Sequence, residues 1–495
     1  MLRVLTKFNA LGAPAKSAMW FTICSMLQKC VSYLTTPIFT RLLTSEQFGI
    51  YTVYQSWFSV ITILCTLNLS YNVFHRAMVE YPDDRDGYIS SMQGLTAVIT
   101  LAVFSTFLLL PALWESVLQL PDELIFCIFA DIFFLQSFAF WQTKQRFEYR
   151  YRALVALTLA MTVLSQGLGV VAVLATDSGV FGRIYPVVAI DILVGLFFMI
   201  LQYARGKKFF SKRYWKFALT FNLPLLPHYL STVVLNQADR VMIGRVCGMG
   251  DVAIYGVAYS LAMGLSFFIS AVNSSLIPWT YQKLATGDVA QQRRIGDVGL
   301  ALSALLAMTL LVLVALGPEL MAFLAPASYS AALWVVPPVA LAVLASMYVW
   351  LFVNVETYYG ENAYVAVVSI GAAVLNVVLN AVALPAFGFV AAGWTTLASY
   401  AAMAAGHAFF MRRIQTKHGA TNVYRAQPMI GLAVFTLLLS MGFMALYQIT
   451  LVRLTTLAVL CALAYVNRSH FKAAISVIRK RKASDDETKG GTNVR

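Results

Sequence analysis

The stretch TPIFTRLLTSEQFGIYTVYQSW (residues 36–57) sets Arg41 and Glu46 between two apolar runs in a chain that is otherwise poor in charge. A related phrase, GRVCGMGDVAIYGVAYSLA, occurs at residues 244–262. Superposed with a constant offset of 204 residues, the two share the pattern R-x8-I-Y-x-V-x2-S. The matched pairs are Arg41 with Arg245, Ile50 with Ile254, Tyr51 with Tyr255, Val53 with Val257 and Ser56 with Ser260. This pattern indicates a chain built from two related halves.

The composition is that of a multi-pass membrane protein. Of the 495 residues, 60% are hydrophobic and 12% are charged, whereas soluble domains carry about 25% charged residues. No polar segment between the apolar runs is long enough to form a separate soluble domain. Hydropathy windows of about 19 residues predict an all-α fold with fourteen transmembrane helices. They lie at 17–38, 48–69, 89–112, 122–142, 153–175, 182–203, 219–241, 252–276, 297–316, 331–353, 363–384, 388–411, 427–447 and 450–466.

The basic residues alternate between the two sides that this count defines. The connections assigned to the cytoplasm, together with both termini, hold 30 of the 36 lysines and arginines. Short cytoplasmic loops of membrane proteins are rich in these residues, so we expect both termini to be cytoplasmic. The same rule explains the net charge of +14 without a nucleic-acid partner.

The repeat predicts two six-helix halves. An offset of six helices keeps both halves in the same orientation, and parallel repeats of this kind are a transporter architecture. We expect a first lobe over 1–204 (helices one to six), a cytoplasmic amphipathic linker over 205–221, and a second lobe over 222–413 (helices seven to twelve). Two further helices follow in 427–466, and a basic cytoplasmic tail over 467–495 is polar enough to be disordered.

Several kinds of chemistry find no signature in the sequence. It contains no GxxxxGK[ST], HExxH or GxSxG motif. The six cysteines include no CxxC pair and lie in or beside apolar runs, which favours packing over a metal site or a disulfide framework. No external connection is large enough for a catalytic domain. We therefore expect a transporter without a cofactor or a metal, and not an enzyme.

The stretch at 36–57, together with LPLLPHYLSTVVLNQADRVMIG (223–244) and AIYGVAYSLA (253–262), resembles the bacterial polysaccharide-unit flippases. These O-antigen and capsule translocases belong to the multidrug/oligosaccharidyl-lipid/polysaccharide exporter superfamily. The resemblance implies two six-helix lobes in a V shape, two C-terminal helices, and alternating access in the cytoplasmic membrane. Its substrate would be an undecaprenyl-diphosphate-linked oligosaccharide carried from the inner to the outer leaflet. Its partners would be membrane lipid and, on the product side, polysaccharide polymerase and chain-length proteins.

Two alternative functions remain open. A multidrug or cation antiporter of the same superfamily would line its cavity with carboxylates. A membrane polysaccharide polymerase or ligase would need a sizeable external loop with catalytic residues. The excess of cations in and near the predicted helices favours the flippase over both.

A dianionic diphosphate that crosses a low-dielectric region needs fixed cations, and intramembrane charge is functional by default. Lys29 lies in the middle of the first predicted helix, where it either faces the cavity or pairs with Asp131 or Asp191. Arg41 and Arg245 occupy equivalent places in the repeat, as substrate ligands or as interfacial residues that reach lipid headgroups.

Asp239 and Arg240 point about 100° apart on a helix. We expect Arg240 to face the cavity and Asp239 to tie neighbouring helices or, like Asp191, to bind a coupling ion such as H⁺ or Na⁺. The i,i+4 pair Asn376 and Asn380 favours interhelical hydrogen bonding.

Pro224 and Pro227 mark either a hinge or a simple helix start in the seventh predicted helix. Arg183 and Arg453 are expected in short external turns, exposed to solvent.

Overall fold

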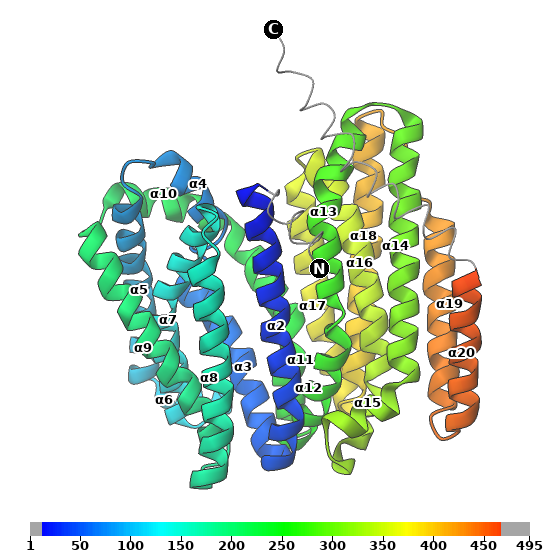
Figure 1. Ribbon diagram of the computed structural model, residues 1–495, viewed down its shortest axis with the longest axis horizontal. Coiled ribbons are helices and arrows are strands. Elements are labelled where there is room, and N and C mark those ends of the chain that lie inside the picture. The colour runs from blue at the N-terminus through cyan, green and yellow to red at the C-terminus, as the bar shows by residue number, and fades with distance from the viewer. Residues whose placement is uncertain (1–11, 467–495) are drawn as a thin grey trace, which may run out of the picture. The chain divides into compact units, whose positions relative to one another are not determined.

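The computed structural model describes residues 12–466, and the regular elements within that range are all helices (Figure 1). The predicted basic tail at 467–495 lies outside the described residues. The first elements are α2 (Ala13–Leu42), α3 (Ser45–Thr66), α4 (Asn72–Glu80), α5 (Arg85–Leu109), α6 (Pro111–Leu118), α7 (Asp122–Phe147), α8 (Arg152–Thr176), α9 (Val180–Gly206), α10 (Lys212–Asn222), the 3₁₀ turn η1 (Leu223–Leu225) and α11 (Leu226–Val246). The remaining elements are α12 (Met249–Met263), α13 (Ser266–Ala285), α14 (Val289–Ala315), α15 (Gly317–Leu324), η2 (Ala327–Trp334), α16 (Val336–Tyr358), α17 (Asn362–Phe387), α18 (Ala391–Lys417), α19 (Ala426–Ala445) and α20 (Thr450–Val466).

These helices confirm an all-α, multi-pass membrane protein. Ten of the helices within the described range are long and apolar enough to cross a bilayer. Each of the fourteen predicted spans overlaps a helix, although two of them are divided. The span at 219–241 covers the end of α10, η1 and α11, and the span at 252–276 is divided between α12 and α13 by a break at residues 264 and 265. The count of fourteen spans and the cytoplasmic position of both termini stay predictions.

The polar residues between the two apolar runs of the opening stretch form a helix boundary. Leu43 and Thr44 have extended backbones between α2 and α3. The Thr44 hydroxyl accepts a hydrogen bond from the Gln47 backbone N–H, and the Gln47 side chain accepts one from the Thr44 N–H. This capping box satisfies two backbone donors that the start of a helix leaves unpaired, so the chain turns back within two residues.

Packing divides the chain into two units, which we describe separately. The first contains the described residues up to Val257 together with 323–329 and 377–392. The second contains 258–322, 330–376 and the described residues from Gly393 onward. Helices α12, α15, α17 and α18 therefore contribute to both units, and the expected lobe boundaries stay predictions.

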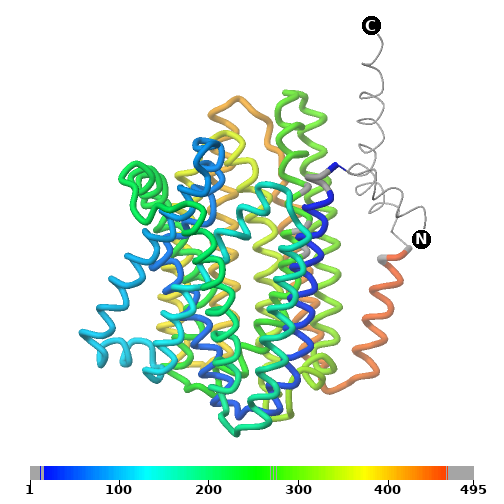
Figure 2. Tube along the Cα trace, turned by 60° about the vertical axis from the view of Figure 1, so that its left-hand side comes forward, coloured from blue at the N-terminus to red at the C-terminus, as the bar shows by residue number. Residues whose placement is uncertain are grey.

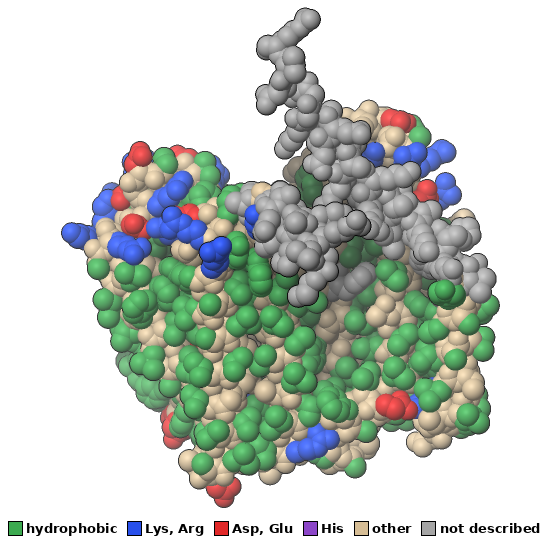
Figure 3. All heavy atoms as spheres, viewed as in Figure 1, with side chains coloured by type: hydrophobic (Ala, Val, Ile, Leu, Met, Phe, Trp, Pro, Cys, Tyr) green, Lys and Arg blue, Asp and Glu red, His purple; other side chains and the backbone are tan. Residues whose placement is uncertain are grey.

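In the first unit, α9 packs against α5, α7 and α8, while α2 packs on α8 and α3 packs on α11. Gly195 permits the close approach of α9 to α7, because a Cβ there would lie 2.3 Å from the Phe134 carbonyl oxygen. Large apolar side chains such as Leu109, Leu193 and Phe197 remain exposed along these helices. Figure 3 shows this apolar surface, with lysines and arginines gathered at the end that carries α4 and α10.

The repeat is visible where α3 meets α12. A Cβ on Gly256 would lie 3.0 Å from Cγ2 of Thr52, and these two positions are equivalent under the offset of 204 residues. A residue that contacts its own equivalent lies on the axis that relates the two copies. One turn away, Gly49 packs against the Met249 backbone so closely that a Cβ would overlap its carbonyl oxygen. The structure thus supports the repeat at the stretch from which it was predicted.

The predicted linker forms α10 and packs against the rest of the first unit. Tyr214 and Ala218 are buried in a cluster with side chains of α4, α5 and α7. The Trp215 indole N–H donates to the Ser91 carbonyl at 3.0 Å. Figure 2 shows α10 and α4 at one end of this unit and α6 at the other. This arrangement is consistent with a membrane-surface role for α10 on the side predicted to be cytoplasmic.

The second unit is held by α14, α16 and α19, with α13 packed on α16. Its interior contains polar pairs. His407 Nδ1 lies 2.9 Å from Glu356 Oε2, with both side chains fully buried, and Asn354 donates to Asn273 at 2.7 Å. Arg453 is buried as well and pairs with Glu319. The expectation that Arg453 is solvated in an external turn was therefore wrong, because its guanidinium pairs with Glu319 and donates to the Tyr447 carbonyl oxygen at 3.2 Å inside the unit.

Candidate functional site

A polar cavity of about 440 Å³ lies within the first unit, lined by side chains of α2, α7, α8 and α9. Lys29 contributes a cation to its wall and Asp191 contributes a carboxylate. The other polar groups are amides and hydroxyls, namely those of Gln28, Ser32, Gln142, Thr158, Thr162, Ser165 and Gln166. Amides and hydroxyls can donate and accept hydrogen bonds, as sugar hydroxyls require, while an ammonium group binds phosphate as a point charge.

The cavity is built on a polar seam between α2 and α8. Thr158, Thr162 and Gln166 follow one another at intervals of four residues and so share one face of α8. The Gln28 amide donates to the Thr162 hydroxyl at 3.2 Å, and the Thr35 hydroxyl donates to the Gln166 side-chain oxygen at 3.1 Å. Hydrogen bonds of this kind join helices inside membranes.

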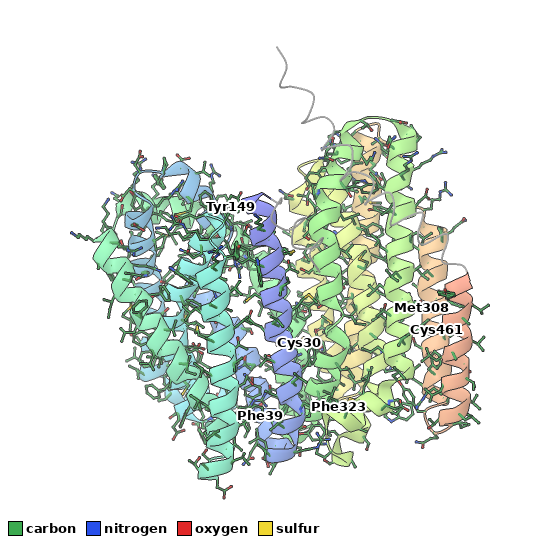
Figure 4. The ribbon with its side chains drawn as sticks, viewed as in Figure 1. Cys30, Phe39, Tyr149, Met308, Phe323 and Cys461 are labelled. Atoms are coloured by element: carbon green, nitrogen blue, oxygen red, sulfur yellow. The ribbon has the colours of Figure 1, made fainter. Side chains whose placement is uncertain are left out.

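Lys29 lies near the middle of α2, as predicted from the sequence. Its neighbour Cys30 is labelled halfway along this helix in Figure 4. At that depth the side chain has no short route to either membrane surface, since about ten residues of helix span half of a bilayer core. Lys29 thus places a cation in the wall of the polar cavity near the middle of α2.

Asp191 also lines a second, smaller cavity of about 120 Å³. The other polar groups around it are Asp131 of α7 and Tyr51, Tyr54 and Gln55 of α3. Asp131, Asp191 and Lys29 are thus gathered around two cavities that share Asp191, although they lie on three helices that are distant in sequence. The sequence predicts Asp131 and Asp191 as alternative partners of Lys29, but it gives no pairing of the two acids with each other.

Asp239 and Arg240 have different surroundings, and Asp239 is the residue that ties helices together. Its carboxylate accepts hydrogen bonds from the Tyr255 hydroxyl and the Asn380 amide, each at 2.6 Å. Arg240 is buried and donates to the Asn236 carbonyl at 2.6 Å and to the Gln237 side chain at 3.1 Å. Arg240 is not among the residues lining the two polar cavities, so its role at the substrate stays a prediction.

Arg41 and Arg245 make equivalent contacts at the ends of their helices. Arg41 Nη1 donates to the Phe323 carbonyl oxygen at 3.1 Å and to that of Pro37 at 2.9 Å. Arg245 Nη2 donates to the Val117 carbonyl oxygen at 2.5 Å. Figure 4 labels Phe323 near the end of α2 that carries Arg41. Each arginine thus reaches a short helix of the opposite sequence half, α15 for Arg41 and α6 for Arg245, and neither lines the polar cavity.

Pro224 lies in η1, and Pro227 is in the first turn of α11. The short 3₁₀ turn joins α10 to α11, so both prolines occupy positions where the missing N–H would in any case have no partner within the helix. This is the arrangement of a helix start. Bending at this junction stays a prediction.

Arg183 corrects the sequence interpretation, because it is buried rather than solvated. Helix α9 begins at Val180, and this places Arg183 in its first turn, facing the ends of α2 and α3. The guanidinium carbon lies 3.5 Å from the centre of the Tyr51 ring, 4.2 Å from that of Phe39 and 4.8 Å from that of Phe48. The three rings hold the cation by cation–π contacts. They all come from the stretch that carries Arg41, where aromatic residues surround the helix boundary.

The second unit contains an apolar groove of about 870 Å³ between α16, α18 and α19. Its walls are leucine, alanine, methionine and aromatic side chains, while Arg412, Arg413 and Thr416 line it near the end of α18. An apolar groove with cations at one end matches the chemistry of a lipid phosphate and its chain.

Residues 15–283, which are more than half of the chain, match the family described as "Polysaccharide biosynthesis protein". The chain belongs to the polysaccharide biosynthesis protein family. The matched segment includes both copies of the repeated phrase and every residue that lines the two polar cavities.

Two relatives of this family member come from Haemophilus influenzae. Protein 1 of the Lsg locus is 24% identical over 278 residues, which cover 54% of this chain and 66% of the relative. A membrane protein of the same organism is 24% identical over 292 residues, or 55% of this chain and 67% of the relative. The match spans slightly less than two thirds of the first relative's length.

Solved structures show which fold this member of the polysaccharide biosynthesis protein family has. The lipid II flippase MurJ in an inward closed conformation aligns with a TM-score of 0.66 at 11% identity, over 94% of this chain and 99% of MurJ. An inward-facing multidrug resistance MATE family transporter of the MOP superfamily gives 0.60 at 14%, over 80% and 96%. A MOP superfamily transporter from Pyrococcus furiosus gives 0.55 at 14%, over 83% and 98%. The fold is that of the MOP superfamily transporters.

Proposed function

We propose that this protein is a flippase that carries an undecaprenyl-diphosphate-linked oligosaccharide from the inner to the outer leaflet of the bacterial cytoplasmic membrane by alternating access. The observation that carries the proposal is the polar cavity around Lys29 inside a bundle of membrane-spanning helices. Charged and polar groups at that depth are costly unless they are used. Family membership and a fold shared with a lipid II flippase support the same conclusion.

The polar cavity has the groups that the head of such a substrate needs. Lys29 would bind the diphosphate, and the amides and hydroxyls of α2, α7 and α8 would hydrogen-bond the sugars. Arg41, Arg240 and Arg245 remain proposed ligands of the diphosphate along its route. The apolar groove of the second unit would suit the polyprenyl chain, with Arg412 and Arg413 near its phosphate.

The carboxylate pair Asp131 and Asp191 favours a second candidate, a cation antiporter of the same superfamily. The larger cavity argues against drug transport, because its polar lining consists mainly of hydroxyls and amides with one lysine, whereas sites for drug-sized ligands are mostly apolar. A polymerase or ligase is disfavoured by a fold shared with transporters.

After translocation by the proposed flippase, the oligosaccharide unit would pass to polymerase and chain-length proteins. Asp239 and Asp191 are proposed sites for an ion that drives this transport.

The test is genetic complementation in the native host. Deletion of the gene should make the complete lipid-linked oligosaccharide accumulate while surface polysaccharide, such as O-antigen or capsule, disappears. The wild-type gene should reverse both effects. Lys29→Ala should restore less than about a tenth of the surface polymer, in line with the loss of one charged hydrogen bond. Lys29→Arg should restore more than Lys29→Ala because it keeps the charge.

Lys207→Ala is the matched control, because this exposed residue follows α9 and lies outside both polar cavities. It should complement fully. Normal surface polymer in the deletion strain, combined with a new sensitivity to cationic drugs, would overturn the flippase and support the antiporter.

A further inference from the structure

We propose that the exposed face of α10 binds the headgroups of anionic phospholipids in the leaflet on the side predicted to be cytoplasmic. This face, the α10 lipid face, consists of Phe209, Phe210, Lys212, Arg213 and Lys216. It has no part in the proposed function, which concerns a substrate cavity lined by other helices. The inference therefore goes beyond that function and does not depend on it.

Helix α10 has a buried side and a charged side. Tyr214 and Ala218 are one turn apart, and both are buried in a cluster with side chains of α4, α5 and α7. At about 100° per residue, the exposed Lys212, Arg213 and Lys216 lie on the opposite side of the helix. The packing of the buried side thus turns the three cations away from the first unit.

These cations have no counter-charge within the fold. Residues 205–216 include six lysines and arginines and no acid. The carboxylate of Asp84 is occupied by Lys208 and Tyr214. Among the described residues, the three cations of the α10 lipid face form no ion pair with a carboxylate. They are therefore available to phosphate groups, which ammonium and guanidinium groups bind by charged hydrogen bonds.

Two exposed phenylalanines adjoin the cations. Phe209 and Phe210 are 53% and 60% exposed, and the Phe210 ring packs edge to face on Trp215, with 4.8 Å between the ring centres. Apolar rings beside basic residues are typical of helices that lie in the headgroup region, where the rings reach acyl chains and the cations reach phosphates. A nucleic acid or an acidic protein would pair with the cations but leave both phenylalanines in water.

The position of α10 along α5 also favours a lipid. A Cβ at Gly94 would lie 2.0 Å from the Phe209 carbonyl oxygen, and the Trp215 indole donates to the Ser91 carbonyl oxygen. Gly94 and Ser91 both belong to the start of the span predicted at 89–112. The α10 lipid face is thus level with the boundary of the predicted bilayer core, where anionic headgroups attract basic segments.

The experiment uses the full-length chain in phosphatidylcholine nanodiscs that contain a small fraction of spin-labelled lipid. After replacement of the six native cysteines, Thr220→Cys, at an exposed position of α10, carries a fluorophore that a doxyl lipid quenches on contact. Half quenching should need at least about fivefold less doxyl-phosphatidylglycerol than doxyl-phosphatidylcholine, because one cation near an anionic leaflet contributes about this factor.

Lys212→Gln/Lys216→Gln should bring this ratio close to one, whereas Lys212→Arg/Lys216→Arg, which keeps both charges, should leave it unchanged. Arg293→Gln/Arg294→Gln is the matched control, because this exposed pair lies on α14, on the side also predicted to be cytoplasmic. It should keep the original ratio. A ratio that persists in Lys212→Gln/Lys216→Gln would overturn the site.

Two other results would also overturn it. If neither lipid quenches the fluorophore, α10 does not lie on the leaflet and its cations serve a soluble partner. If inorganic phosphate abolishes the preference but sodium chloride of equal ionic strength does not, the cations form a site for free phosphate. None of these measurements uses transport, so a protein without flippase activity would still show the lipid preference.

Discussion

Single residues show how this chain keeps charge inside a bilayer-spanning fold. Arg183 has no carboxylate among its closest contacts and is held by three aromatic rings. Lys29 opens onto a cavity, and Asp239 accepts two hydrogen bonds. Each ionisable group is therefore stabilised in a different way, by rings, by a polar space or by hydrogen-bond donors.

A double-mutant cycle should detect the contact between Arg183 and Tyr51. Removing the ring by Tyr51→Leu leaves a buried cation with less compensation, and it should lower the free energy of unfolding by more than Tyr51→Leu does in an Arg183→Leu background. We expect a coupling of about 2 kcal/mol, the value for a desolvated cation–π pair. The free energies would be measured by unfolding in mixed detergent and SDS. Additive effects would show that the two side chains are not coupled.

Arg41 and Arg245 should be sensitive to substitution although they donate to backbone carbonyls. Arg41→Ala and Arg245→Ala are each expected to reduce surface polysaccharide by about fivefold while the protein still inserts. Lysine should restore activity only partly where the guanidinium fork binds the diphosphate, because an ammonium group is a point charge and cannot donate the paired hydrogen bonds. Arg425→Ala is the control and should leave the amount of surface polysaccharide unchanged. Full activity of the double alanine variant would contradict both a substrate role and a structural role for the pair.

At the scale of elements, α10 is a docked surface helix and not a free linker. A Cβ at Gly94 of α5 would lie 2.0 Å from the Phe209 carbonyl oxygen, so the chain leading into α10 lies directly on α5. Asp84, the N-cap residue of α5, accepts hydrogen bonds from Lys208 and Tyr214. The start of α10 is thus fixed both by backbone contact and by a carboxylate.

This docking should depend on pH. Partial burial opposes ionisation of Asp84, but the hydrogen bonds from Lys208 and Tyr214 outweigh it and lower the pKa of its carboxyl below the ordinary value. A carboxyl with a lowered folded-state pKa stabilises the fold above its unfolded pKa of about 4, and this contribution is lost as the pH falls through the folded value. Asp84→Asn should therefore lower Tm at pH 7, and the difference from the wild type should shrink below about pH 4.

The measurement is Tm by intrinsic fluorescence from about pH 3 to pH 7. Asp83→Asn, at the exposed neighbouring position, should show no such pattern. A Tm difference for Asp84→Asn that stays constant across this range would contradict the assignment.

At the scale of the whole molecule, the repeat and the distribution of charge both bear on the orientation of the chain in the membrane. Thr52 and Gly256 lie on the axis of the repeat, and the lysines and arginines of the first unit gather at the end with α4 and α10 (Figure 3). Both observations agree with the topology predicted from the sequence, which puts α10 on the cytoplasmic side and α6 on the outer side.

Cysteine labelling in intact cells should confirm that topology. All six native cysteines are free thiols, so they would first be replaced. In that background Ser116→Cys on α6 should react with a membrane-impermeant maleimide. Lys216→Cys on α10 should react only after the cells are permeabilised. Labelling of Lys216→Cys in intact cells would reverse the predicted orientation and the cytoplasmic termini with it.

The sequence predicted the helices well, but it predicted less well which side chains of different helices contact one another. Length and hydropathy predicted an all-α membrane protein whose spans each overlap a helix, and the constant offset predicted the repeat, because both are properties of a linear pattern. The pair Asp131 and Asp191 was missed because the rotation of two helices about 60 residues apart decides whether their side chains meet. Arg183 was misplaced because its burial depends on contacts with the rings of Phe39, Phe48 and Tyr51 on other helices, which hydropathy does not show. Lys29 could be found because a charge in the middle of an apolar run needs no tertiary information.

The acceptors of Arg41 and Arg245 have a consequence for the evolution of this family. Phe323 and Val117 supply carbonyl oxygens, which every amino acid carries, so their side chains are free to change as long as the short helices keep their shape. Across homologues, we expect the two arginines to persist opposite variable partners. Statistics of correlated substitution would then find no signal between these columns, although the atoms are in direct contact. An alignment would show two invariant arginines without covarying partners, although each donates a hydrogen bond to a backbone carbonyl of the other sequence half.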